Sequence, residues 1–160
     1  MSGTVQKYAV SQRLLHWLTL LLLIVSFVSH EAMKTSWIAL RRTGEATFST
    51  GTAVHVWIGV AILVLTLLRI VLRFTQGAPA PVEGQNPMIT LASAIVHGLL
   101  YIVLLLIPLS GIMAWFVGIT DAGEVHEVLF NIGWVLVALH IVAALYHQFF
   151  LKDNLIARMR

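Results

Sequence analysis

Residues 125–151 read VHEVLFNIGWVLVALHIVAALYHQFFL, a run that is long enough and apolar enough to cross a lipid bilayer. About 18 or more residues of this kind predict a transmembrane helix. Three more such stretches lie upstream. The sequence therefore predicts four transmembrane helices, which span about residues 12–33, 52–74, 89–117 and 125–151.

The composition of the whole chain agrees with a membrane protein. Of its 160 residues, 59% are hydrophobic and only 11% are charged, whereas a soluble domain keeps about a quarter of its residues charged. Inside lipid every backbone polar group must be paired within the protein, and helices achieve this within a single segment. Short loops make successive helices antiparallel. We expect an all-α membrane protein, a single domain over residues 1–160 that forms a four-helix up-and-down bundle.

The basic residues predict the orientation in the membrane. With the N-terminus in the cytoplasm, seven of the ten Lys and Arg residues lie inside and three outside, as the positive-inside rule requires. The inner seven are Lys7, Arg13, Arg69, Arg73, Lys152, Arg158 and Arg160; the outer three are Lys34, Arg41 and Arg42. Both termini are predicted to be cytoplasmic. Because these residues lie at helix ends rather than in one patch, the pI near 9.7 does not indicate a nucleic-acid partner.

The residues that are absent exclude several kinds of chemistry. The chain has no cysteine, which rules out disulfides, thiolate-bound iron–sulfur clusters and the covalent attachment of c-type haem. Neither a Ser/His/Asp arrangement nor a glycine-rich phosphate loop is present. No small-residue cleavage site follows the first apolar run, so a cleaved signal peptide is not expected.

Histidine is the ionisable residue that recurs in the predicted spans. There are seven, all in a span or at its end: His16, His30, His55, His97, His126, His140 and His147. A single histidine near a helix end is ordinarily an interfacial residue. Seven of them are harder to explain in that way, because ionisable groups inside a membrane are functional candidates and neutral imidazole is a common metal ligand.

The spacing of the histidines predicts two metal-binding pairs. His126 and His140 are fourteen residues apart, which places them about 40° apart around a helix and about 21 Å apart along it. We expect His55 to face His126 at the outer side and His16 to face His140 at the inner side. A facing pair of imidazoles suits a six-coordinate haem iron, whereas zinc prefers a tetrahedral shell, usually with cysteine or carboxylate ligands. The pattern therefore predicts two haems, one above the other.

Three further residues are candidates for roles around these pairs. Gly59, one turn after His55, leaves room for a flat ring. Arg69 is fourteen residues after His55 and is placed to pair with haem propionates at the inner site, although it also fits a positive-inside anchor. His147 lies about 10 Å beyond His140 and suits a proton donor, a catalytic role, at a quinone site; the alternative is an interfacial side chain that reaches the headgroups.

Two histidines remain outside these assignments. His97 lies near the inner side of the third span, so it is an alternative ligand of the inner haem. His30, at the outer end of the first span, is interpreted as interfacial.

Four stretches resemble the bacterial cytochrome b561 family: YAVSQRLLHWL around His16, AVHVWIGVAILVLTLLRIVLR around His55, HGLLYIVLLLIPLSG from His97, and VHEVLFNIGWVLVALHIVAALYHQFFLKDN with the last three histidines. The cytochrome b subunits of nickel–iron hydrogenases and formate dehydrogenases have a similar architecture. The resemblance implies two haem b groups held by the same four histidines. It also implies electron transport in the bacterial cytoplasmic (inner) membrane, with membrane lipid around the chain and ubiquinone as substrate.

The resemblance leaves two functions open. Small relatives include a superoxide oxidase that passes electrons from superoxide at the periplasmic face to ubiquinone at the cytoplasmic face. The same reaction is expected here, with superoxide or a redox protein as periplasmic donor and Lys34, Arg41 and Arg42 attracting an anion. The alternative is a membrane-anchor subunit that passes electrons between a partner dehydrogenase and quinone. Leu14 and Leu151 depart from that oxidase's quinone region, where it has a serine and an aromatic residue. Apart from the resemblance, the residues alone also allow a haem-free transporter or scaffold, whose histidines would bind protons or metal.

Overall fold

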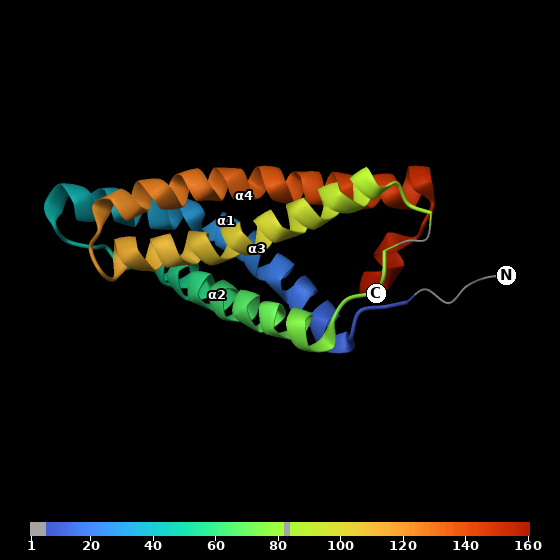
Figure 1. Ribbon diagram of the computed structural model, residues 1–160. Coiled ribbons are helices and arrows are strands. Elements are labelled where there is room, and N and C mark those ends of the chain that lie inside the picture. The colour runs from blue at the N-terminus through green and yellow to red at the C-terminus, as the bar shows by residue number, and fades with distance from the viewer. Residues whose placement is uncertain (1–5, 82–83) are drawn as a thin grey trace.

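The computed structural model describes residues 6–81 and 84–160, and four long helices make up most of it (Figure 1). They are α1 (Val10–Thr43), α2 (Thr50–Gln76), α3 (Pro87–Trp115) and α4 (Thr120–Tyr146). Each is long and apolar enough to cross a membrane. No strand occurs in the described part of the chain. The predicted all-α, four-span architecture is confirmed.

The connections between helices are short, and local sequence signals set them. Gly44 ends α1 with a left-handed backbone (φ 75°), which glycine adopts without steric strain. The Ser49 side chain accepts a hydrogen bond from the Thr52 N–H at the start of α2, and Asn86 caps α3 in the same way just before Pro87. The first and last segments meet at one end of the bundle, where the Tyr8 N–H donates to the Arg158 carbonyl at 3.1 Å (Figure 1).

Helix α1 is longer than its hydropathy predicts. The expected helix ended near residue 33, whereas α1 continues for ten more residues, to Thr43. Packing against the start of α4 supports this extension: a Cβ placed on Gly123 would lie only 2.7 Å from Trp37 Cζ2. An exposed ion pair between Arg41 and Glu124, 3.6 Å apart, joins the same two segments. Helix α4 likewise begins at Thr120, before the predicted residue 125.

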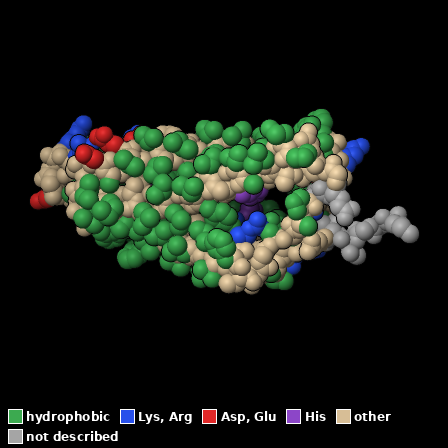
Figure 2. Space-filling model, in the orientation of Figure 1, with side chains coloured by type: hydrophobic (Ala, Val, Ile, Leu, Met, Phe, Trp, Pro, Cys, Tyr) green, Lys and Arg blue, Asp and Glu red, His purple; other side chains and the backbone are tan. Residues whose placement is uncertain are grey.

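The surface of the bundle is that of a protein surrounded by lipid. Large apolar side chains are exposed along every helix, while few lie in a closed core: Ile62, Val103, Leu104, Ala114 and Leu136. In Figure 2 hydrophobic side chains cover the length of the visible face, and acidic side chains gather at one end. The exception is a hollow in which a basic side chain lies beside histidine.

Two short helical segments follow α4. The last predicted turn is a π-helix, η1 (His147–Leu151), followed by a short 3-10 helix, η2 (Leu155–Met159). The tail returns beneath the bundle: the Trp17 indole N–H donates to the Met159 carbonyl at 2.8 Å, and Arg158 donates to the Ala80 carbonyl at 2.6 Å. These contacts tie the C-terminal segment to α1 and to the loop between α2 and α3.

Candidate functional site

Two histidines face each other near the end of the bundle where α2 and α4 begin, which the positive-inside rule predicts to be the outer end. His55, near the start of α2, is buried, and its ring centre lies 6.3 Å from that of His126 on α4. A metal lies about 2 Å from an imidazole nitrogen, and that nitrogen lies about 1 Å from its ring centre, so two axial imidazoles have centres about 6 Å apart. The separation fits one iron between the two rings.

Hydrogen bonds leave both of these rings ready to bind a metal. His55 Nδ1 lies 3.1 Å from the Ser26 carbonyl oxygen, and His126 Nδ1 lies 2.7 Å from that of Ile107. A carbonyl only accepts, so each Nδ1 carries the hydrogen and each Nε2 keeps a free lone pair. Metal-binding histidines commonly have this arrangement.

Space for a flat cofactor lies beside this pair. Two adjoining cavities of about 70 Å³ and about 360 Å³ share His55, Gly59, Pro108 and His126 in their walls. A Cβ on Gly59 would meet nothing within 4 Å, so the absent side chain leaves open space there. A Cβ on Gly111 would lie 3.1 Å from the His126 ring, so that glycine allows the ring its position.

Three histidines meet towards the opposite end, which is predicted to be the inner one. The ring centres of His16 on α1 and His140 on α4 are 6.2 Å apart, a separation that fits an iron between them. His97 on α3 lies closer to His140, at 5.0 Å, which is short for two ligands of one iron. The Nδ1 of His97 does donate to the Ser93 carbonyl at 2.6 Å, in the manner of the outer ligands. The structure therefore brings together both the predicted ligand and its alternative.

Arg69 lies at the inner histidines. Its Nη2 is 3.2 Å from His16 Nδ1, and its guanidinium carbon is 5.5 Å from the Tyr101 ring centre. Because a guanidinium only donates hydrogen bonds, His16 Nδ1 accepts here and the ring hydrogen lies on Nε2. For His16 to bind iron through Nε2, Arg69 would have to leave Nδ1. Its pairing with propionates stays a prediction.

His30 lies in the outer site rather than apart from it, which differs from its interfacial interpretation. Its ring stacks on Phe130 with centres 4.9 Å apart and lies 6.0 Å from the His55 ring. Its Nδ1 is buried and has no hydrogen-bond partner among the described residues. The sequence held a signal for this: His30 is fourteen residues after His16, the same spacing that identified the pair on α4.

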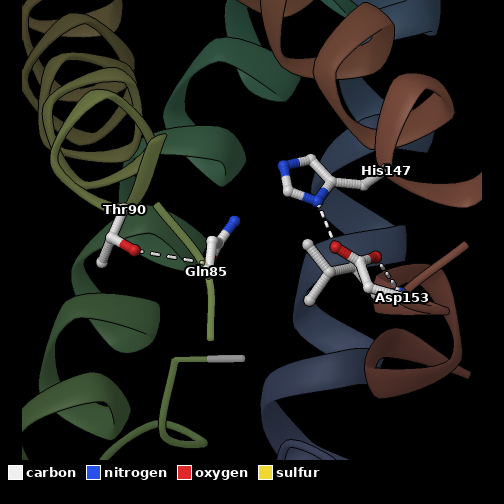
Figure 3. Close-up of polar contacts among 5 residues, drawn as sticks. Gln85, Thr90, His147 and Asp153 are labelled. Atoms are coloured by element: carbon white, nitrogen blue, oxygen red, sulfur yellow. Dashed lines mark hydrogen bonds and ion pairs between the residues drawn. The ribbon is translucent and has the colours of Figure 1, made fainter. Parts of the chain in front are cut away.

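His147 is buried at the inner end and paired with a carboxylate. Its Nδ1 lies 2.5 Å from Asp153 Oδ2, and both side chains are nearly inaccessible, 8% and 12% exposed (Figure 3). The ring is therefore not an interfacial side chain that reaches for the headgroups. Sequence reasoning missed Asp153, which follows the last span in a Lys-Asp-Asn run.

Within residues 6–81 and 84–160, no three His, Cys, Asp or Glu side chains are grouped as a metal-ion site. Pairs of histidines are nevertheless what haem needs, because the porphyrin supplies the other four nitrogen ligands. A membrane-spanning helical bundle with facing imidazole pairs therefore fits a protein that holds haem in its interior.

The chain belongs to the prokaryotic cytochrome b561 family, whose model matches residues 7–160. It is 38% identical to cytochrome b562 of Cereibacter sphaeroides over 152 residues. The aligned region covers 95% of this chain and 94% of that protein. It is 29% identical to cytochrome b561 homolog 1 of Escherichia coli, and 28% identical to probable superoxide oxidase CybB of Yersinia pestis, each with 96% of both chains covered. Members of this family carry electrons in the bacterial inner membrane, and the family implies haem b as cofactor.

Proposed function

We propose that this protein transfers electrons across the bacterial inner membrane between a periplasmic donor and ubiquinone, through two haem b groups. His55 and His126 would hold the outer haem, and His16 and His140 the inner one. The observation that carries the proposal is the matching separation of the two ring pairs, 6.3 Å and 6.2 Å, at two depths of the bundle. When bound, each haem iron supplies one-electron chemistry.

The residues around the pairs prepare them for this role. The carbonyls of Ser26 and Ile107 hold the outer rings with Nε2 free, which fixes ligand orientation before the cofactor enters. At the inner site, a propionate would draw Arg69 away from His16, because a charged carboxylate is a stronger acceptor than a neutral imidazole nitrogen. His16 could then carry its hydrogen on Nδ1.

Ubiquinone would be bound at the inner end, near His147. Reduction of a quinone to a hydroquinone takes two electrons and two protons, so a titratable group beside the inner site is required. His147 is buried there at the end of α4, and it is our candidate for moving a proton between the substrate and the cytoplasm. Membership of the prokaryotic cytochrome b561 family supports quinone-linked electron transfer.

Superoxide is our candidate for the periplasmic donor. Lys34 and Arg41 line the larger outer cavity and would attract an anion towards the outer haem. Arg41 is partly balanced by Glu124, and Glu127 also lines this cavity. Neutralising Lys34, Arg41 and Arg42 together should therefore lower superoxide consumption and weaken its dependence on ionic strength. Unchanged consumption would argue against this donor.

The purified protein tests the proposal as a whole. A reduced-minus-oxidised spectrum should show a b-type haem band, and decylubiquinone should reoxidise the dithionite-reduced haem under argon. A spectrum without a haem band would mean that the chain is not a haem protein. A reduced haem that decylubiquinone does not reoxidise would remove the quinone step. Isolation in a fixed ratio with a large dehydrogenase subunit would identify the membrane-anchor alternative instead.

A further inference from the structure

We propose that Asp153 is a positioning residue for His147, and that the Gln85 carboxamide lies opposite the His147 ring. His147 and Gln85 would then together bind one hydroxyl of a hydroquinone. This inference rests on the proposed function and assigns two residues to its inner site. It starts from the burial of the His147–Asp153 pair and from the direction of the Gln85 carboxamide in Figure 3.

Both carboxylate oxygens of Asp153 are engaged. Oδ2 lies 2.5 Å from His147 Nδ1, and Oδ1 accepts the Leu155 N–H at 3.3 Å. The Asp153 N–H also points back to the His147 carbonyl, at 3.4 Å. Two side-chain contacts and one backbone contact thus hold Asp153 beneath the end of α4. A carboxylate only accepts hydrogen bonds, so the ring carries its hydrogen on Nδ1 and presents a bare Nε2.

The backbone around Asp153 is arranged to bring this carboxylate back under the ring. Lys152 and Asn154, on either side of it, both have a left-handed backbone, with φ of 54° and 56°. Non-glycine residues rarely adopt this strained conformation, and they keep it where the surroundings hold them. Here the tail is held by the bonds from Trp17 and Arg158 described above. Such a held, unfavourable turn supports a functional reason for its shape.

Gln85 comes from a different segment, just before α3. Thr90 Oγ1 donates to Gln85 Oε1 at 3.4 Å, which occupies the oxygen of the carboxamide and leaves its NH2 group free. In Figure 3 that NH2 group points towards the His147 ring. Figure 1 likewise places the start of α3 beside the end of α4. A hydrogen-bond donor and an acceptor therefore face each other at the inner end.

This pair of groups selects a hydroxyl over a carbonyl oxygen. A phenolic O–H donates to the bare Nε2 of His147, while its oxygen accepts from the Gln85 amide. A quinone carbonyl only accepts, so it satisfies Gln85 and leaves Nε2 without a partner. A buried group without a partner weakens binding. We therefore expect the site to bind the hydroquinone more tightly than the quinone.

The variant Asp153→Asn changes the ring without removing the side chain. The oxygen of the new carboxamide can still accept the Leu155 N–H, and the NH2 group then faces His147. His147 Nδ1 must accept from it, so the ring hydrogen moves to Nε2. In 15N-histidine-labelled protein, with His147→Gln used to assign the signal, the 15N shifts of Nδ1 and Nε2 should exchange. A purely structural role for Asp153 would leave them as they are.

Binding supplies the second measurement. Equilibrium dialysis of decylubiquinol against the haem-loaded protein, kept reduced under argon, should give a Kd about tenfold higher for Asp153→Asn than for the unaltered chain. Gln85→Glu, which keeps the shape but loses the donor, should weaken binding similarly. Matched controls are Asp121→Asn at the outer end and Gln76→Leu. The Gln76 side-chain oxygen accepts a hydrogen bond from Ser11 at 3.0 Å, away from the proposed site. Both should bind as the unaltered chain does.

The outcomes separate this inference from the proposed function. If the unaltered chain binds no decylubiquinol, quinone exchange itself is wrong. If it binds and both variants keep its Kd, the assignment of Asp153 and Gln85 is wrong while the proposed function stands. Should Asp153→Asn lose haem and fail to fold, Gln85→Glu still decides, because Gln85 lies in a loop.

Discussion

Replacing His126 or His140 with alanine, one at a time, tests the arrangement on which the proposed function depends. Each is expected to provide one of the two ligands of a separate haem. The unaltered protein should hold about two haems per chain, and each variant should hold about one. In the His126→Ala protein the outer haem is lost, and in the His140→Ala protein the inner one.

The expected halving follows from the distance between the sites. Fourteen residues separate the two ligands on α4, or about 21 Å along the helix. Effects at sites more than about 7–10 Å apart that share no partners are usually additive. The outer rings bond to carbonyls of α1 and α3, whereas no such bond joins them to the inner rings. Loss of one site should leave the other intact.

A pyridine haemochrome assay, divided by protein concentration, measures this ratio. His147→Gln serves as a matched control, because it alters a histidine of the same chain segment that pairs with Asp153 rather than with another ring, and it should keep about two haems. A single variant that keeps two haems would refute the ligand assignment. A variant that loses both, yet elutes as a folded protein on size exclusion, would refute the independence of the sites.

Three further predictions concern residues around these sites. His97→Phe should keep the inner haem whereas His16→Phe loses it, as haem content will show; the reverse result would make His97 the ligand. Gly111→Ala should displace the His126 ring, because the new Cβ would lie 3.1 Å from it, and should lower outer-haem occupancy without affecting the inner haem. Gly123→Ala should destabilise the protein by about 1–3 kcal/mol, because its Cβ would overlap Trp37; thermal unfolding checks this, and Gly98→Ala, whose Cβ meets nothing, should not destabilise.

The long-range features of the fold were predictable because each depends on a pattern repeated over a whole helix. Hydropathy identified the four spans, and the fourteen-residue spacing on α4 predicted two depths that matched His55 and His16. Such patterns need no knowledge of tertiary contacts. The structure adds the separations of the rings, which sequence could not supply.

Features that depend on individual contacts were missed. Hydropathy cannot detect the extension of α1 beyond residue 33, because packing of Trp37 on Gly123 supports it rather than burial in lipid. Asp153 was overlooked because only a left-handed turn on each side brings it beneath His147. His30 is a different case, since the spacing rule would have found it had it been applied to α1 as well as to α4.

The length of α1 has a consequence for how the two proposed reactants would reach the protein. Its 34 residues span about 51 Å, against about 30 Å for the hydrocarbon layer, so one end stands well above the bilayer in water. The C-terminal part of α1 packs against the start of α4, and both segments line the larger outer cavity. Under the proposed function, an aqueous periplasmic donor would reach the outer cavity from the water phase at this end, whereas ubiquinone would approach the other end laterally through the lipid. The two proposed reactants would therefore reach the protein through different solvents and would not compete for one entrance.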